Sequence, residues 1–331
     1  MSTAAAAAPT GAGDLRPAYW LRNPHVQSML ASTAWRARRV RRAARPLLTA
    51  ARELLLDCGA GVRLQCFISA PPQARRGPVL LLHGWEGSAD SFYVLSLGAL
   101  LFAQGHTVAR LNLRDHGATH HLNRELFHSC RLPEVVGAVA ALQRVLPGPL
   151  TLIGFSLGGN FMLRVAAQAR TAQLSLAQVI AVSPVLDPAE TLAALQGGLP
   201  GYEYYFVRKW LRSLRLKHLA WPGSLDPEAL GRLRDLKRMT AELVRAHTEY
   251  PSLDAYLEGY SITGARLAGL EVRSTIYTAQ DDPIIPAGGL ARLARPAALR
   301  LVVTRYGGHC GFFERLRGPT WLERQIVAQL A

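Results

Sequence analysis

Cysteine is scarce in this sequence of 331 residues, and its cysteines do not stand in pairs. The cysteines are Cys58, Cys66, Cys130 and Cys310, and none belongs to a Cys-x-x-Cys motif. Zinc-ligand spacing is therefore absent, and a disulfide framework is not expected in a chain of this length. A reducing, cytoplasmic location is the simplest interpretation.

A secretion signal and a long apolar run are also lacking. Residues 1–13 are rich in alanine but have no basic stretch followed by an apolar one, so they do not form a signal peptide. The longest uncharged stretch, residues 91–109, is interrupted by Gln104, Gly105 and His106, which favours a helix, a turn and a strand. We expect a disordered leader over residues 1–16 and one globular domain over residues 17–331.

Lysine is also scarce, although the chain is strongly basic. The formal net charge is +15, and only Lys209, Lys217 and Lys237 among 38 basic residues are lysine. Such a charge could attract anionic surfaces or substrates, but no nucleic-acid motif accompanies it, so we expect no nucleic-acid partner. The densest basic run predicts a solvated face that could touch an anionic membrane; it comprises Arg36, Arg38, Arg39, Arg41, Arg42 and Arg45.

Strand-like apolar runs alternate with helical patterns through most of the chain. The expected strands are residues 53–58, 63–69, 78–83, 107–113, 150–155, 178–185, 273–278 and 299–304. The expected helices are residues 90–103, 133–145, 159–168, 287–294 and 320–330. This alternation predicts an α/β fold with a mostly parallel, eight-stranded sheet and helices on both faces. Residues 188–270 show helical spacing (205–216 and 226–245) but no convincing strand, and predict a helical cap inserted over the strand ends.

A Gly-x-Ser-x-Gly motif formed by Gly154, Ser156 and Gly158 stands between an expected strand and an expected helix. This context is typical of the nucleophile turn of α/β-hydrolases, where glycines are needed because side chains would collide with the adjoining strand and helix. The helix that follows directs its N-terminal N–H groups toward developing negative charge. Ser156 is therefore the predicted nucleophile.

A serine hydroxyl needs a base to remove its proton, and the base needs an acid to orient it. In α/β-hydrolases the chain order is serine, acid, histidine. Asp281 and Asp282 follow the expected strand 273–278, and His309 follows the last expected strand. We predict His309 as the base and Asp282 as the acid, because Asp282 directly precedes an apolar segment that ends in proline; Asp281 is the alternative.

The oxyanion of an acyl-transfer intermediate needs hydrogen-bond donors held in place. One expected donor is the backbone N–H of Leu157, directly after the nucleophile, and the other is the N–H of Trp85, after the expected strand 78–83. The side chain of His83 is expected to brace the turn of this loop. His116, His120, His121 and His128 fall within one segment without companion carboxylates at helical spacing, so we predict no metal site and no cofactor.

Seven short segments together resemble the YheT-like α/β-hydrolases, a family that includes bacterial hydrolases and yeast medium-chain fatty acid ethyl ester synthases. The segments are residues 23–28 (Asn-Pro-His-Val-Gln-Ser), 83–88 (His-Gly-Trp-Glu-Gly-Ser), 111–117, 127–129, 154–160, 281–283 and 307–312. The resemblance covers roughly residues 17–313; Trp85 and Phe127 depart from the residues common in the family. It implies esterase or acyltransferase activity on acyl chains.

The sequence thus predicts a serine carboxylesterase that acts on a small-molecule ester, with an acyl chain as the expected substrate group. Two alternatives stay open: an acyltransferase that passes the acyl group to an alcohol, and a non-catalytic, membrane-associated lipid-binding protein, suggested by the arginine run and by the basic amphipathic residues 208–212. The aromatic residues of the expected cap could line an acyl pocket or simply pack the cap onto the sheet; they are Tyr202, Tyr204, Tyr205, Phe206 and Trp210.

Overall fold

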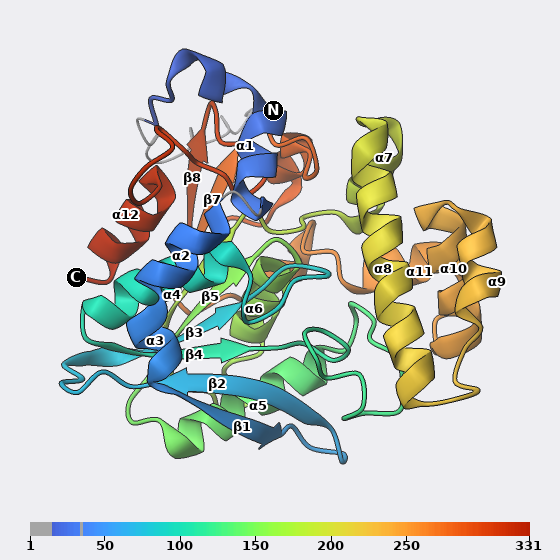
Figure 1. The fold of residues 1–331 in the computed structure, drawn as a ribbon, viewed down its shortest axis with the longest axis horizontal. Coiled ribbons are helices and arrows are strands. Elements are labelled where there is room, and N and C mark those ends of the chain that lie inside the picture. The colour runs from blue at the N-terminus through green and yellow to red at the C-terminus, as the bar shows by residue number, and fades with distance from the viewer. Residues whose placement is uncertain (1–14, 34–35) are drawn as a thin grey trace, which may run out of the picture.

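A single mixed sheet organises the protein, whose computed structural model describes residues 15–33 and 36–331 (Figure 1). The strand order is β1-β2-β4-β3-β5-β6-β7-β8. The strands are β1 (Ala51–Asp57), β2 (Arg63–Ser69), β3 (Arg76–Leu82), β4 (His106–Leu111), β5 (Leu150–Phe155), β6 (Leu176–Val182), β7 (Ser274–Ala279) and β8 (Leu299–Thr304). Only the pairs β1–β2 and β2–β4 are antiparallel, so the predicted mostly parallel, eight-stranded sheet is confirmed.

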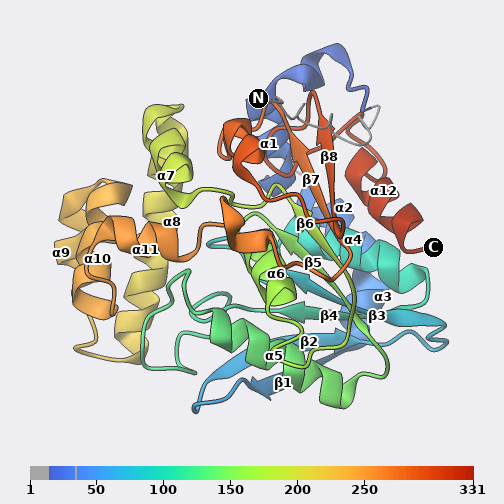
Figure 2. The same ribbon diagram turned by 180° about the vertical axis from the view of Figure 1, so that it is seen from behind.

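Helices cover both faces of this sheet, as predicted. Helix α4 (Phe92–Ala103) packs on β3 and β4, and α3 (Arg45–Thr49) and α12 (Trp321–Gln329) pack against α4 on that side. Helices α5 (Leu132–Val145) and α6 (Leu157–Ala167) cover the opposite face, which is turned to the viewer in Figure 2. The central strands are therefore buried on both faces, which explains their continuous apolar sequences.

The N-terminal segment joins the α4 side of the sheet. It forms η1 (Tyr19–Arg22), α1 (Pro24–Ser32) and α2 (Ala37–Ala43) before α3. Asn23 caps α1 because its side-chain oxygen accepts hydrogen bonds from the N–H groups of His25 and Val26. Leu15 is already buried, whereas residues 1–14 of the predicted disordered leader lie outside the described residues.

Between β6 and β7 the described chain forms helices only, and these stand beside the main body of the molecule (Figure 1). They are α7 (Pro188–Gly197), α8 (Pro200–Ala220), α9 (Pro227–Leu233), α10 (Leu236–His247), α11 (Leu253–Gly259) and η3 (Ala265–Leu267), and together we call them the cap. Within residues 15–33 and 36–331, no helix combines the length and apolar character that crossing a bilayer requires.

Two helices differ from the sequence-based expectation. The helix expected over residues 226–245 is split into α9 and α10, because Arg234 adopts a left-handed conformation (φ 52°) and Asp235 starts a new helix by accepting a hydrogen bond from Arg238 N. Residues 287–294 form a short 3-10 helix, η4 (Ala287–Arg292), because the adjacent Gly288 and Gly289 weaken a full α-helix at this place.

Candidate active site

Ser156 occupies a strained turn between β5 and α6. Its φ is 53° and its ψ is −119°, a conformation that costs a non-glycine residue about 1–3 kcal/mol and persists only where the surroundings enforce it. Close packing enforces it here: a Cβ on Gly154 would overlap Gly158, and a Cβ on Gly158 would overlap the carbonyl oxygens of Leu82 and His83. The hydroxyl of Ser156 is thereby held out at the strand end, as the glycine spacing predicts.

His309 and Asp282 follow β8 and β7, at the same edge of the sheet. Asp282 Oδ2 lies 2.9 Å from Nδ1 of His309, while its Oδ1 accepts hydrogen bonds from Ile284 N (2.9 Å) and Ile285 N (3.0 Å). Asp282 is 7% exposed, so this carboxylate is fixed by the backbone and shielded from water. The geometry orients the imidazole ring with Nε2 available on its far side.

Asp281, the alternative acid, has a different environment. Its Oδ1 accepts a hydrogen bond from Gly308 N at 2.9 Å, and its Oδ2 has no hydrogen-bond partner among the described residues. Burial raises the pKa of this carboxyl group. Asp281 therefore supports the loop that carries His309, whereas Asp282 contacts the ring itself.

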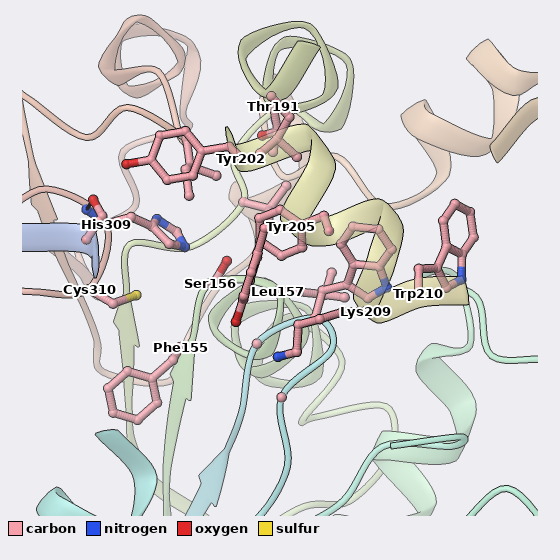
Figure 3. A pocket seen from close by; sticks show the side chains of 18 of the residues that line it. Phe155, Ser156, Leu157, Thr191, Tyr202, Tyr205, Lys209, Trp210, His309 and Cys310 are labelled. Carbon is pink, nitrogen blue, oxygen red and sulfur yellow. Dashed lines mark hydrogen bonds between the residues drawn. The ribbon is translucent and has the colours of Figure 1, made fainter. Parts of the chain in front are cut away.

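The basicity of His309 depends on this carboxylate. Burial alone lowers the pKa of the imidazole, but the negative charge of Asp282, the charge of Cys310 and the hydrogen bonds to both side chains outweigh burial, and the pKa lies well above its ordinary value of 6.5. Figure 3 shows the ring of His309 and the side chain of Ser156 directed toward the same space. The Ser156 hydroxyl forms no hydrogen bond within residues 15–33 and 36–331, so its proton is free to be donated.

The loop after β3 offers one unused backbone donor. Gly84 N donates to the hydroxyl of Tyr93 at 3.1 Å, Glu86 N donates to Nε2 of His116 at 3.1 Å, and Gly87 N donates to Gly84 O at 3.0 Å. The N–H of Trp85 has no partner among the described residues. Leu157, the other predicted donor residue, is the first residue of α6, where N–H groups also lack partners within the helix.

The histidines near this loop have structural contacts. His83 braces the turn as expected: its Nδ1 contacts Gly84 O at 2.7 Å and its Nε2 accepts a hydrogen bond from Leu113 N at 3.2 Å. Burial lowers the pKa of His83 to about 4 and lowers that of His116 well below 6.5, so both rings are neutral. Nowhere in the described part of the chain do three or more His, Cys, Asp or Glu side chains form a group that could hold a metal ion.

A cavity of about 740 Å³ lies between the strand ends and the cap. Ser156, Leu157, Trp85 and His309 line one wall of it. Of the aromatic cap residues singled out from the sequence, the cavity is lined by Tyr202, Tyr205, Phe206 and Trp210. Tyr204 instead is 62% exposed, so this one residue belongs to neither a pocket nor the cap–sheet packing.

The cap and the donor loop are in direct contact. The ring of Trp85 stacks on that of Phe206 with centroids 5.3 Å apart, and the ammonium of Lys209 donates to Glu86 O at 2.7 Å (Figure 3 shows its direction). The peptide groups on either side of Glu86 are thus held by His116 and by Lys209. Sequence reasoning missed both residues, because they lie 30 and 123 positions from Glu86 and carry no local motif.

The N-terminal motif of residues 23–28 supports the histidine loop. The hydroxyl of Ser28 accepts a hydrogen bond from His309 N at 2.8 Å, and the side-chain amide of Gln27 bonds both N and O of Phe313. His25 Nδ1 and the hydroxyl of Tyr202 are 3.0 Å apart, which links α1 to the cap. This motif therefore fixes the loop of His309 from the N-terminal part of the chain.

Comparison with known proteins by sequence identifies a family and several relatives. The family model described as alpha/beta hydrolase fold matches residues 77–316, more than two thirds of the chain. Phospholipase ABHD3 of Mus musculus is 22% identical over 256 residues, which are 75% of this chain and 62% of that protein. Protein phosphatase methylesterase 1 of Rattus norvegicus is 41% identical over 93 residues, 28% of this chain and 24% of the methylesterase. The chain thus spans less than two thirds of either relative.

Solved structures show the same fold at low sequence identity. A membrane phospholipase A, described as a bacterial virulence factor, superimposes with a TM-score of 0.53 at 15% identity over 92% of this chain and 91% of that one. The Pyrococcus furiosus esterase Pf2001 superimposes with a TM-score of 0.52 at 14% identity, over 78% and 82% of the two chains. At such identities the likeness describes the fold alone.

Proposed function

The chain belongs to the alpha/beta hydrolase fold family, and we propose that it is a serine carboxylic ester hydrolase with Ser156 as its nucleophile. The observation that carries the proposal is that Ser156 and His309 line one wall of the cavity while His309 is in hydrogen-bond contact with the buried Asp282. The names of the relatives, which include a phospholipase and an esterase, support the same reaction class. Within the family, the seven motif segments favour the YheT-like group.

The proposed reaction begins when His309 Nε2 takes the proton of the Ser156 hydroxyl as the oxygen attacks an ester carbonyl. Asp282 holds the ring by Nδ1 and stabilises the imidazolium that forms. The protonated ring then gives its proton to the leaving alcohol, and an acyl-enzyme remains on Ser156. Water, deprotonated by the same ring, releases the acid and restores the serine.

The N–H groups of Leu157 and Trp85 are the proposed donors to the oxyanion. Trp85 is favoured over its neighbours because the N–H groups of Gly84 and Glu86 are already engaged by Tyr93 and His116. A donor that needs no rearrangement when charge develops stabilises the transition state most effectively. The ring stacking of Trp85 on Phe206 and the contacts to Glu86 fix the loop in this position.

The cavity favours an apolar acyl group as the part of the substrate that lies beyond the carbonyl. Leucines and aromatic rings of the cap dominate its wall, among them Leu192, Leu195, Phe206 and Trp210. Apolar walls with a few convergent polar groups are typical of small-molecule sites. We therefore propose esters of acyl chains as the substrate class. Transfer of the acyl group to an alcohol shares every step up to the acyl-enzyme and is the second candidate reaction.

The test compares Ser156→Ala with Ser129→Ala, because Ser129 also lines the cavity but has no proposed role in bond formation. Ser156→Ala should lose labelling by a fluorophosphonate probe and all nitrophenyl-ester turnover, while Ser129→Ala should keep both. Turnover by Ser156→Ala at the wild-type rate would refute the proposed nucleophile. Product analysis in mixtures of water and ethanol then separates hydrolysis from transfer.

A further inference from the structure

Helix α8 exposes one continuous face along its 21 residues. Six exposed side chains make up this face: Tyr204, Tyr205, Arg208, Arg212, Leu216 and Leu219. At about 100° per residue these positions fall within a sector of about 120°, so they form one stripe about 22 Å long. Figure 1 shows α8 on the side turned to the viewer, with the other cap helices beside or behind it.

The stripe combines apolar groups with uncompensated positive charge. Tyr204, Leu216 and Leu219 are 62%, 39% and 74% exposed. Arg208 donates to the hydroxyl of Tyr204 at 3.0 Å, and within the described residues neither Arg208 nor Arg212 forms an ion pair. Arg215 at the edge of the stripe is paired with Glu228 at 3.0 Å. Aromatic, aliphatic and arginine side chains on one helical face are the composition of helices that lie in a membrane interface.

The mouth of the cavity opens beside this stripe. Three large apolar residues both line the cavity and remain exposed: Met29 at 53%, Leu199 at 51% and Tyr205 at 44%. Met29 belongs to α1, Leu199 directly precedes α8, and Tyr205 belongs to the stripe itself. The rim is therefore apolar where the cavity meets solvent. A substrate that enters the cavity through this rim passes over the surface that carries the stripe of α8.

A second basic helix faces the same side of the molecule. Arg38, Arg41 and Arg42 of α2 are exposed, and α2 lies toward the viewer in Figure 1 and away from the viewer in Figure 2, as α8 does. The whole chain carries a formal net charge of +15, which complements an anionic surface. Each basic side chain close to an anionic bilayer strengthens binding about fivefold.

We propose that the exposed stripe of α8 docks on an anionic lipid bilayer and presents the cavity mouth to it. The arginines contact lipid phosphates, and the tyrosine and leucine side chains enter the boundary between headgroups and acyl chains. Docking of this kind needs no catalysis, so the proposal stands separately from the proposed ester hydrolysis. It also accounts for an apolar rim that would otherwise face water.

The test is co-sedimentation of the full chain, carrying Ser156→Ala, with vesicles of equal parts phosphatidylglycerol and phosphatidylcholine, and with phosphatidylcholine alone. We expect binding to the mixed vesicles that weakens as salt is added. Arg208→Gln together with Arg212→Gln should lower the partition coefficient about 25-fold. Leu216→Ser together with Leu219→Ser should lower it at least about tenfold, because their apolar area no longer enters the bilayer.

The control is Arg144→Gln with Arg170→Gln, which removes the same formal charge from exposed sites at the end of α5 and after α6, on the side turned to the viewer in Figure 2. Arg170 pairs with Glu271 at 3.1 Å, but these side chains are 85% and 65% exposed, so the pair contributes little. This variant should bind within about twofold of the parent protein. Three results would overturn the proposal: no sedimentation with mixed vesicles, equal sedimentation with phosphatidylcholine alone, or an equal loss in the α8 and control variants. Because the protein tested lacks the proposed nucleophile, none of these results depends on the hydrolase assignment.

Discussion

Replacing Lys217 with methionine is expected to destabilise the fold strongly, because this residue anchors α8 in the interior. The Lys217 side chain is 1% exposed, and its ammonium lies 2.8 Å from Asp115 Oδ1. It also donates to the carbonyl oxygens of Asn123 at 2.5 Å and Glu125 at 3.0 Å. Methionine has a similar length, so the substitution removes the charge and the hydrogen bonds but keeps most of the volume.

The expected loss of stability follows from the buried carboxylate that is left without its partner. Asp115 is 6% exposed, and without the ammonium its carboxylate keeps only the hydrogen bond from Phe127 N at 2.8 Å. Removing one partner of a buried pair costs about 3–5 kcal/mol. With an unfolding entropy of about 2.1 cal/mol/K per residue over 331 residues, a loss of 4 kcal/mol lowers Tm by about 6 °C.

The matched control is Arg215→Met on the same helix. Its ion pair with Glu228 has nearly the same length, 3.0 Å, but the two side chains are 55% and 67% exposed. An exposed pair contributes about 0–1 kcal/mol, so Tm should fall by less than about 2 °C. Thermal unfolding followed by circular dichroism and by tryptophan fluorescence measures both variants; Trp221, directly after α8, makes the fluorescence sensitive to the cap.

The pH dependence of the stability gives an independent check on this explanation of the effect of Lys217→Met. Burial already raises the pKa of Asp115, and losing Lys217 raises it further. The folded variant then holds a proton that the unfolded chain releases, so its stability falls as pH rises and the loss is greater at pH 8 than at pH 5. Asp115→Leu added to Lys217→Met should restore part of the stability. Equal Tm shifts for Lys217→Met and Arg215→Met would refute the reasoning.

Three further predictions concern the active site. The ratio kcat/KM should rise with pH through an apparent pKa above 6.5, because His309 must be neutral to act. Asp282→Asn should lower this pKa and cut kcat about 10⁴-fold, and an unchanged pH profile would contradict the assigned contact between Asp282 and His309. Gly158→Ala should destabilise the fold by about 3 kcal/mol in urea unfolding, because its Cβ would overlap the carbonyl oxygen of His83; unchanged stability would refute the packing argument. Lys209→Met should lower kcat more than it raises KM, because it frees the loop after β3 that carries the proposed oxyanion donor, the N–H of Trp85. Lys209→Arg should retain most activity, and an effect of Lys209→Met on KM alone would count against this positioning role.

The sequence alone determined the sheet and predicted the main candidate residues of the site. Apolar runs separated by helical patterns predict strands and helices, since both depend on local periodicity. Ser156 is the predicted nucleophile because its glycine neighbours favour a tight turn between one strand and the next helix. His309 is the predicted base because parallel strands end at one edge of a sheet, so residues that follow late strands come close together.

Only the tertiary structure decided which neighbouring groups make contact. The sequence favours Asp282 over Asp281 only by its place before an apolar segment, whereas the packing of two loops brings Asp282 to the ring of His309 and Asp281 to Gly308. Sequence could not show that Tyr204 faces solvent while Tyr205 lines the cavity, nor that Lys209 reaches Glu86. Local patterns record the conformation of a segment, whereas these contacts join segments up to 123 positions apart, and their geometry exists only once the core has packed.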